Sequence, residues 1–346
     1  MSSLSYPPML RPLNPRQDLL LIADLIELCF AQTLDQSGRE YIRQLRQISK
    51  EPSAYWIGRA ANHFYAPRQG FVWEEEGRVV GNLSIFPFQT PHGVEYLIAN
   101  VAVHPDFRRR SIARLLTERA LDYIRERGGH RAWLNVRQDN LAAVSLYRQL
   151  GFSEQLRRTH WQYRHSSSSF LGERVEKGFP PDSGTQIRPR IAADWKMHQH
   201  WLLLTYPQEY HWHLDFEPDW FAPGFFAWLR GFLNEHRYQH YSILKEKQLI
   251  GIATLQSSPR EGKMLWMACD SEWENEAIQG FLSYFLRNCT SQEKITLDYP
   301  AQRAMQPLQE AGFTPTQTLI WMERLVAPKN NPLQKFQLQN PSNPIL

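Results

Sequence analysis

Three consecutive arginines, Arg108–Arg110, stand where a predicted strand gives way to a predicted helix. The strand ends at Pro105, because proline has no N–H to donate to a sheet. A helix is expected next, since apolar residues recur near the 3.6-residue period, at Ile112, Leu115, Leu116 and Leu121. The first turn of a helix has unpaired N–H groups and a dipole that favours negative charge. This stretch is therefore predicted to bind an anion. Because Ser111 and Ala113 are small, a phosphate could approach the backbone there.

On composition alone, the same stretch is more simply explained as a strand–helix corner with solvated charges. A second group of residues downstream changes that interpretation. Asn140–Leu150 is predicted to be a helix with one apolar face, formed by Ala142, Ala143, Leu146 and Leu150. Gly151 ends this helix, and Phe152 leads into the next strand. The two stretches together favour a binding site over a solvated corner.

The elements that must position these residues alternate along the first half of the chain. Strands are predicted at residues 9–11, 70–75, 78–88, 95–103, 132–136, 155–158 and 160–164, and helices at 18–30, 38–48, 112–127 and 140–150. The pair Glu76-Gly77, between two apolar runs, is typical of a tight hairpin turn. Residues 51–70 are irregular and are an expected loop on the substrate side.

The second half repeats this order after a linker at residues 165–186 that contains four consecutive serines. Strands are predicted at 187–191, 238–245, 249–257, 264–269, 294–299 and 318–324, and helices at 192–204, 223–233, 272–288 and 303–311. The clearest echo sets Leu146–Phe152 beside Pro307–Phe313, since each ends in Gly-Phe and precedes an apolar-aromatic strand. An internal repeat of this length predicts two similar domains, followed by a loose tail at 327–346.

Composition and charge narrow the class of protein. With 346 residues, 42% hydrophobic and 21% charged, the chain is long enough for two globular domains. The net charge of +4 comes from the first half, where residues 1–164 carry 22 Lys and Arg against 16 Asp and Glu. This excess suits a small anionic ligand and is too local for a nucleic-acid partner, so no nucleic acid is expected.

No targeting or membrane segment is evident, so no membrane partner is expected. No apolar run approaches the roughly 18 residues of a membrane span, and Met1–Pro15 lacks the pattern of a signal peptide. The three cysteines, Cys29, Cys269 and Cys289, have neither disulfide-like nor zinc-like spacing. Free thiols and a cytoplasmic location are therefore predicted.

With these stretches in view, residues 8–164 resemble an N-acetyltransferase domain of the GNAT superfamily. Val101–Arg108 matches the strand that leads into the family's cofactor loop, and Arg108–Ala113 lies on its Arg/Gln-x-x-Gly-x-Gly/Ala signature. The family's later motif is matched by Asn140, Ala143, Tyr147, Gly151 and Phe152. The resemblance implies an α/β fold: two tandem GNAT-like domains, each with a mixed, mostly antiparallel sheet flanked by helices.

The resemblance also separates the two halves. Residues 8–164 are expected to hold the acetyl-CoA site. Residues 187–326 resemble the same fold, but Asp270–Glu276 places four carboxylates where the first half has its arginines. Because like charge would repel a pyrophosphate, the second domain is expected to be a degenerate copy without its own acetyl-CoA.

The resemblance implies that the protein transfers an acetyl group from acetyl-CoA to a primary amine. Backbone groups of Val101, Ala102 and Val103 would then hold the pantetheine arm and polarise the thioester. The pyrophosphate would be bound by the loop and first helical turn, namely Arg108, Arg109, Arg110, Ser111, Ile112, Ala113 and Arg114. Asn140 and Ala143 would complete the cofactor site, and Tyr147 matches the family's general acid.

One residue departs from the signature, because Ser111 stands where the family has its first glycine. Its side chain would either crowd the pyrophosphate or donate a hydrogen bond to it. No general base is marked: Glu95 opens the cofactor strand, and Glu74–Glu76 lies near a hairpin tip. Any of them could act through water or simply be solvated.

Other groups are interpreted structurally. The histidines at 198, 200, 211 and 213 have metal-like spacing, but without cysteine partners we attribute them to aromatic packing and expect no metal. The acidic residues at 215, 217 and 219 would either attract a cationic substrate or form a solvated loop. The alternative function is a non-enzymatic module that binds acyl-CoA or another protein. The acceptor, a small-molecule or peptide amine, and the oligomeric state stay open.

Overall fold

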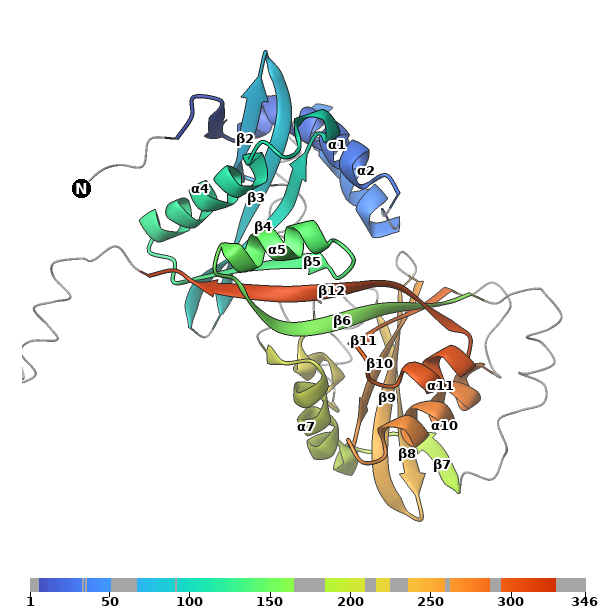
Figure 1. The fold of residues 1–346 in the computed structure, drawn as a ribbon. Coiled ribbons are helices and arrows are strands. Elements are labelled where there is room, and N and C mark those ends of the chain that lie inside the picture. The colour runs from blue at the N-terminus through green and yellow to red at the C-terminus, as the bar shows by residue number, and fades with distance from the viewer. Residues whose placement is uncertain are drawn as a thin grey trace, which may run out of the picture. The chain divides into compact units, whose positions relative to one another are not determined.

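The computed structural model describes residues 6–32, 34, 36–50, 67–90, 92–164, 184–208, 216–224, 236–258, 262–286 and 294–327. The chain forms two compact units (Figure 1). Unit 1 comprises Met1–Val136, Asn140–Gln155 and Trp321–Leu346. Unit 2 comprises Arg137–Asp139 and Leu156–Ile320. In the described part of the chain, no helix is long and apolar enough to cross a membrane.

Unit 1 is built on a mixed sheet in the order β1-β2-β3-β4-β5-β12. Its elements are β1 (Leu10–Pro12), α1 (Pro15–Phe30), α2 (Gln36–Lys50), β2 (Gln69–Glu75), β3 (Arg78–Thr90), β4 (Gly93–Val103), α4 (Ile112–Glu126), β5 (Arg131–Arg137) and α5 (Leu141–Gln149). The strands β1 to β4 pair antiparallel, whereas β4 and β5 pair parallel. Parallel neighbours need a crossover connection, which α4 supplies.

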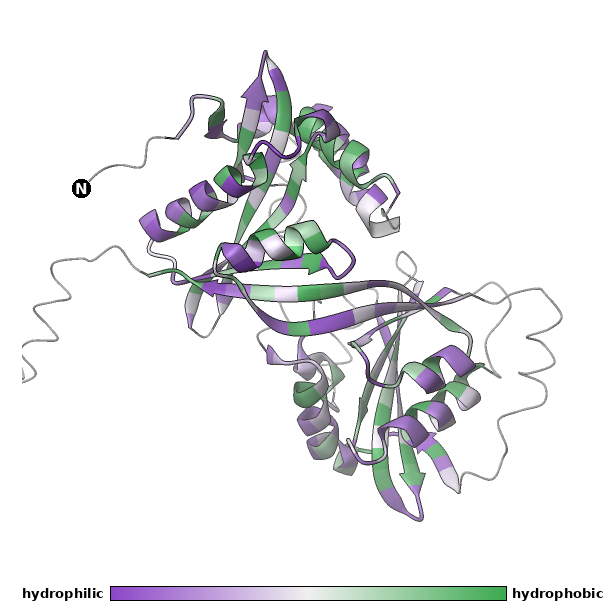
Figure 2. Ribbon diagram, in the orientation of Figure 1, coloured by the Kyte–Doolittle hydropathy of each residue, from purple (hydrophilic) through white to green (hydrophobic). Residues whose placement is uncertain are grey.

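Helices cover both faces of the unit 1 sheet. Val72 of β2 packs in a core with α1 and α2, whereas its neighbour Phe71 meets Tyr123 of α4 with ring centroids 5.9 Å apart. A Cβ on Gly81 of β3 would lie 2.8 Å from Ile112 of α4, so this helix lies directly on the strand. Figure 2 shows hydrophilic and hydrophobic residues alternating along α4, as expected of a helix with one buried face.

Unit 2 has a sheet in the order β12-β6-β11-β10-β9-β8-β7. Its elements are β6 (Ser153–Arg164), β7 (Thr185–Pro189), α7 (Trp195–Thr205), β8 (Arg237–Lys245), β9 (Gln248–Ser258), β10 (Gly262–Cys269), α10 (Glu274–Leu286), β11 (Lys294–Pro300), α11 (Met305–Glu310) and β12 (Phe313–Leu325). The strands β10 and β11 pair parallel, as β4 and β5 do in unit 1. The predicted α/β fold with mixed, mostly antiparallel sheets is therefore confirmed.

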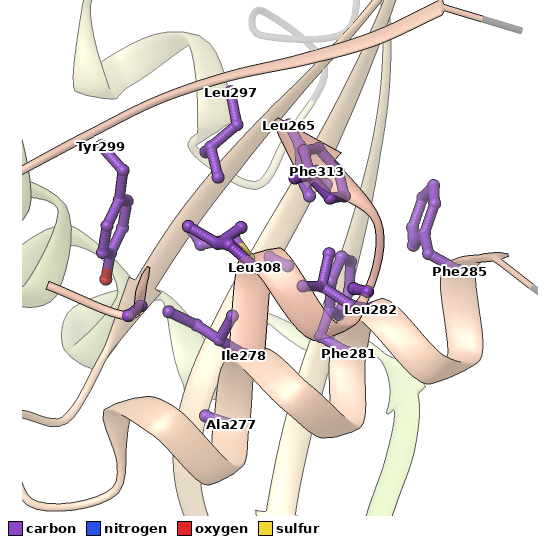
Figure 3. Close-up of a cluster of buried hydrophobic side chains, with 14 of the residues drawn as sticks. Leu265, Ala277, Ile278, Phe281, Leu282, Phe285, Leu297, Tyr299, Leu308 and Phe313 are labelled. Atoms are coloured by element: carbon purple, nitrogen blue, oxygen red, sulfur yellow. The ribbon is translucent and has the colours of Figure 1, made fainter. Parts of the chain in front are cut away.

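The core of unit 2 is aliphatic and aromatic. Side chains of α10 and α11 meet the β10 and β11 strands in one buried cluster, which includes Ile278, Phe281, Leu297 and Leu308 (Figure 3). Burying a side chain of this size stabilises the fold by about 1.5–3 kcal/mol. This packing keeps the second copy of the fold intact, whether or not it binds a ligand.

The elements differ from the sequence expectations in a few places. The two strands predicted at 155–158 and 160–164 are one strand, β6, because Thr159 pairs with Tyr299 without interruption. The strand predicted to reach Ile191 ends at Pro189. Residues 51–66 and most of the helix predicted at 223–233 lie outside the described residues.

Strands β6 and β12, which are the last strands of the first and second halves of the sequence, are each divided between the two units. Residues Leu156–Arg164 of β6 belong to unit 2, where the strand pairs with β11. The end of β12, Trp321–Leu325, belongs to unit 1, where Val326 N–H donates to the His130 carbonyl at 2.8 Å. Each unit thus includes a strand segment from the other half of the sequence.

Two histidines in unit 2 make its stability depend on pH. Burial lowers the pKa of His198 well below its usual value and that of His240 to about 3. Both are neutral in the folded state, so below about pH 6.5 the unfolded chain binds more protons. We expect unfolding free energy to fall between pH 6.5 and 5 by up to about 1 kcal/mol per pH unit for each histidine.

The test is urea denaturation of wild type and His198→Leu across that pH range. The variant should show a shallower dependence on pH. Exposed His200, on the same helix, gives the matched control His200→Gln, which should keep the wild-type slope. Equal slopes in all three proteins would contradict the assignment.

Candidate active site

The parallel strands β4 and β5 are paired over a short distance and then separate. Tyr96, Leu97 and Ile98 are in register with Ala132, Trp133 and Leu134, and the pairing stops there. Strand β4 nevertheless continues to Val103. Its last five residues therefore present backbone groups toward β5 that the sheet does not use.

The direction of these backbone groups follows from the pairing of β4 with β3. His104 N–H donates to the Val80 carbonyl of β3 at 2.8 Å. Because alternate residues of a strand point their N–H groups in opposite directions, Val101 and Val103 face away from β3, into the gap beside β5. Ala102 lies between them, is buried, and is opposite Asn82 of β3.

The loop after β4 is the predicted phosphate site. A short 3-10 turn, Pro105–Phe107, is capped by His104, whose Nδ1 accepts a hydrogen bond from Asp106 N–H at 3.3 Å. The three arginines that follow are exposed. The helix α4 then begins at Ile112, so the N–H groups of its first turn open toward the arginines. The predicted basic turn and helix N-terminus are thus adjacent.

The arginines differ in what they contact. Arg108 Nε donates to the Val103 carbonyl at 3.2 Å, and Cys29 Sγ lies 3.3 Å from the same oxygen. Arg110 lies over the Phe107 ring at 4.9 Å and 3.6 Å from a carboxylate oxygen of Glu75. Arg108 therefore fixes the end of β4, whereas Arg110 remains at the surface of the loop.

Ser111 occupies a backbone conformation that favours glycine. Its φ of 59° and ψ of 10° lie in the left-handed region, which costs an L-residue with a Cβ about 1–2 kcal/mol. Its side chain makes no hydrogen bond to the start of α4. The family's glycine at this position is thus explained by backbone geometry, in addition to its proximity to a ligand.

The second motif lies beside the first. Asn140 is the N-cap of α5, and its Oδ1 accepts a hydrogen bond from Ala143 N–H at 3.2 Å. Arg114, in the first turn of α4, donates to the Gln149 side chain at the end of α5. This bond brings together the helices that carry the two motifs.

Tyr147 is buried on α5. Its ring packs edge-on against Phe152 at 6.0 Å, and burial raises the pKa of its phenol above the ordinary value. The phenol therefore stays protonated at neutral pH and can act as a hydrogen-bond donor.

The glutamates considered as bases have other partners. Glu95 is buried, accepts a hydrogen bond from Trp133 Nε1 at 2.6 Å, and lies eight residues before Val103, about 26 Å along an extended strand. Glu74 binds Arg11 Nε at 2.7 Å, and Glu75 accepts from Trp73 Nε1 at 2.9 Å. The structure does not bring Glu95 together with the arginine loop.

The remaining sequence candidates are dispersed. His198 is buried and His200 exposed, whereas residues 211, 213 and 215 lie outside the described part of the chain. Glu217 is the N-cap of a short 3-10 turn, Pro218–Phe221, and Asp219 lies within that turn. Among the described residues, no three histidine, cysteine or acidic side chains are grouped so that they could hold a metal ion.

The corresponding region of unit 2 carries different chemistry. Strand β10 separates from β11 after Leu265, and Asp270 N–H donates to the Ile250 carbonyl at 3.0 Å, as His104 does to Val80. At the start of α10, however, Glu274 accepts a hydrogen bond from Tyr299 at 2.6 Å and pairs with Arg303. A carboxylate thus occupies the end of the helix that in unit 1 faces arginines.

The space between β10 and β11 is also used by the chain itself. The Tyr206 hydroxyl lies 3.4 Å from Met267 N–H and 3.3 Å from the Asp298 carbonyl, linking the separated strands. Arg158, fully buried, lies over the Tyr206 ring at 4.8 Å and forms an ion pair with Asp298. Counting back from the matched positions Val103 and Cys269, Met267 corresponds to Val101.

Residues 31–152 match the model of the Acetyltransferase (GNAT) family. The [ribosomal protein bS18]-alanine N-acetyltransferase of Escherichia coli (strain K12) is 33% identical over 110 residues, which are 30% of this chain and 74% of that protein. The N-alpha-acetyltransferase RimI of Mycobacterium tuberculosis is 34% identical over 120 residues, 34% of this chain and 69% of that protein.

The chain belongs to the GNAT family of acetyltransferases. The predicted function, transfer of an acetyl group to an amine, is therefore confirmed, and the alternative of a non-enzymatic module is set aside. Two solved structures resemble the whole chain in fold. A GCN5-related N-acetyltransferase from Sphaerobacter thermophilus has a TM-score of 0.56 at 14% identity and covers 94% of this chain and 99% of its own. A tandem GNAT protein from the clavulanic acid biosynthesis pathway has a TM-score of 0.50 at 15% identity, with 93% and 99% covered.

Replacing Ser111 with glycine should stabilise unit 1. The substitution removes the Cβ from a left-handed backbone position, so we expect the free energy of unfolding to rise by about 1 kcal/mol. The measurement is urea denaturation of wild type and Ser111→Gly. The control is Ala113→Gly, two residues into α4, which should destabilise by about 0.5–1 kcal/mol. A loss of stability in Ser111→Gly would show that its side chain has a structural role.

Proposed function

We propose that unit 1 binds acetyl-CoA and transfers its acetyl group to the α-amino group of a peptide or protein. The observation that carries this proposal is the separation of β4 from β5 next to the arginine-flanked N-terminus of α4. A pantetheine arm that lies along β4 and a pyrophosphate at α4 would use the two sets of backbone groups that the fold leaves unpaired. Residues 8–164 and 187–326 are proposed as an active and a degenerate domain.

The proposed cofactor contacts divide by chemistry. Backbone N–H groups of Ile112, Ala113 and Arg114, with the exposed side chains of Arg109 and Arg110, would bind the pyrophosphate. The N–H groups of Val101 and Val103 would bind the pantetheine arm and the thioester carbonyl. Asn140 uses its amide oxygen as the cap of α5, so its amide NH2 is the group that can donate to the cofactor.

The reaction then follows from these groups. The neutral amine attacks the thioester carbon and forms a C–N bond, and negative charge develops on the carbonyl oxygen. We propose that Val101 N–H stabilises this oxyanion. The C–S bond breaks next, and Tyr147 donates a hydrogen bond to the departing thiolate. The amine loses its extra proton to water, which completes the amide and free CoA.

The role proposed for Tyr147 is limited by its raised pKa. A phenol that is harder to ionise than usual is a poor source of a full proton for a thiolate, whose conjugate thiol has a pKa near 8.5. It remains a good hydrogen-bond donor in a buried site, where such a bond is stronger than in water. Its contribution is therefore stabilisation of the leaving group.

This mechanism uses no general base such as Glu95, which limits the kind of acceptor amine that can react. A peptide α-amine has a pKa of about 7.7–8.0, so about a third of it is neutral at pH 7.5, whereas only about one lysine side chain in a thousand is. A site that does not deprotonate its substrate thus favours α-amines. The relatives from E. coli and M. tuberculosis are named for acetylation of an alanine and of an α-amine, which supports the same class.

Replacing Tyr147 with phenylalanine should lower kcat by about 10- to 100-fold, because the leaving thiolate loses its hydrogen-bond donor. Affinity for acetyl-CoA should stay within about threefold, since the pyrophosphate loop is untouched. Release of free CoA with short peptides gives kcat, and calorimetry gives the dissociation constant. An unchanged kcat would remove Tyr147 from the mechanism.

Calorimetry should also give one acetyl-CoA per chain. Tyr206 and Glu274 fill the places in unit 2 that would receive the thioester and the pyrophosphate. The double variant Arg109→Ala/Arg110→Ala should abolish most binding of acetyl-CoA. Lys245→Ala, which removes a basic side chain from unit 2, should leave this binding unchanged. A stoichiometry of two would contradict the proposal for unit 2.

The acceptor class and location can be tested together. A panel of peptides with free and blocked N-termini, beside lysine and small amines, should show turnover that requires the free α-amine. Turnover with small amines alone would overturn the peptide proposal. Free thiols at Cys29 and Cys269 support the proposed cytoplasmic location.

A further inference from the structure

The strand β4 contains a bulge at the point where it separates from β5. Ala99 is opposite Ser84 and Ala102 is opposite Asn82, so Asn100 and Val101 together face a single residue of β3. Asn100 has a φ of 54°, in the left-handed region. A bulge of this kind inserts one residue and changes which backbone groups face each side of the strand.

The bulge decides which amides enter the gap. Ala99 pairs with β3, so in a regular strand the N–H groups of residues 100 and 102 would face the gap and that of Val101 would return to β3. With the left-handed residue in place, Val101 and Val103 face the gap instead. The amide proposed to stabilise the oxyanion thus depends on the conformation of Asn100.

Four side chains hold this conformation. Asn100 Nδ2 donates to the Tyr41 hydroxyl of α2 at 2.7 Å and lies 3.3 Å from Ser84 Oγ. Asn82 Nδ2 donates to the Asn100 carbonyl at 2.9 Å. Asn82 and Ser84 have no exposed surface, whereas Tyr41 and Asn100 are half-buried, so the bonds are partly shielded from water. Both the side chain and the backbone of Asn100 are therefore restrained.

Unit 2 offers an internal comparison. Strand β10 pairs with β9 in unbroken register from Gly262 to Cys269, without a bulge. Matching Gly251 to Gly81 places the apolar Ile252 where unit 1 has Asn82. The unit whose gap is filled by Tyr206 thus lacks both the bulge and the buried asparagine.

One atom of the network has no partner. Asn82 Oδ1 is buried without a hydrogen bond, which is costly, because a buried polar atom has given up its bonds to water. An aliphatic residue, as at Ile252, would avoid that cost. The arrangement is thus less stable than the strand pair allows, and such strain is typical of functional sites.

We infer that Tyr41, Asn82, Ser84 and Asn100 are positioning residues for acetyl transfer, which hold the β4 bulge so that Val101 N–H points at the thioester carbonyl. This inference rests on the proposed function. The network acts through the backbone and touches neither cofactor nor acceptor. Its loss should therefore lower kcat and spare the binding of acetyl-CoA at the arginine loop.

Two substitutions at one position separate backbone from side chain. Asn100→Gly keeps access to the left-handed region, whereas Asn100→Ala disfavours it. The spectroscopic readout is the infrared carbonyl stretch of acetyl-CoA labelled with 13C at the carbonyl, which moves to lower frequency when an N–H polarises the bond. Wild type should show the full shift, and Asn100→Gly a smaller one, because it keeps the left-handed backbone but loses the bonds to Tyr41 and Ser84. Asn100→Ala should lose the shift, with a dissociation constant within about threefold of wild type.

Asn100→Ala should also lower kcat with the best peptide by about 100- to 1,000-fold, as for loss of one oxyanion donor, and Asn100→Gly should recover part of it. An unshifted spectrum in both variants would show that the asparagine side chain acts in some way other than by holding the bulge. A normal shift in Asn100→Ala would overturn the inference while leaving the proposed function intact. Failure of wild type to bind acetyl-CoA would remove both.

The neighbouring residues give tests that do not alter the bulge residue itself. Asn82→Leu removes the donor to the Asn100 carbonyl together with the unpartnered oxygen, and Tyr41→Phe removes the acceptor of Asn100 Nδ2. Both should lower kcat and weaken the carbonyl shift. Asn82→Leu should be at least as resistant to urea as wild type, which distinguishes positioning from a structural role. A variant that is destabilised but keeps the wild-type kcat would contradict the inference.

Discussion

The separation of β4 from β5 is the constraint on which the rest of the site depends. The two strands are parallel, so the chain must cross from the end of one to the start of the other through α4. The crossover places the N-terminus of α4 at the same edge as the last residues of β4. Unpaired strand amides and unpaired helix amides therefore converge there. The arginines add positive charge to a site that the backbone has already formed.

The two units show that the fold alone does not keep this edge of the sheet open. Both have a parallel pair that separates after three residues, and in both a helix follows the longer strand. In unit 2 a tyrosine hydroxyl, a buried arginine and a glutamate occupy the space and the charge positions that unit 1 leaves open. The two units thus share an architecture but differ in the side chains at one edge of the sheet.

Sequence reasoning recovered the parts governed by local rules. The Glu76-Gly77 hairpin has both turn residues at positive φ, 51° and 76°. Three of the four apolar positions that predicted α4, Ile112, Leu116 and Leu121, are buried. The bulge at Asn100 was missed, because an asparagine in an apolar strand gives only a weak signal of left-handed backbone. The structure places Glu95 on β4 at the end remote from the loop, and its burial against Trp133 depends on strand pairing, which the local sequence does not show. The left-handed conformation of Ser111 is also a property of the backbone, and a serine in the sequence does not indicate it.

The division of β6 and β12 between the units has a consequence for biosynthesis. Unit 1 needs Trp321–Leu325 beside β5, yet these residues are made roughly 180 positions after the rest of its sheet. At the usual speed of translation that delay is about 9–37 s. During that time a nascent sheet ends in an open edge at β5, the kind of surface that recruits other strands. Unit 1 can therefore complete its sheet only after β12 has been synthesised.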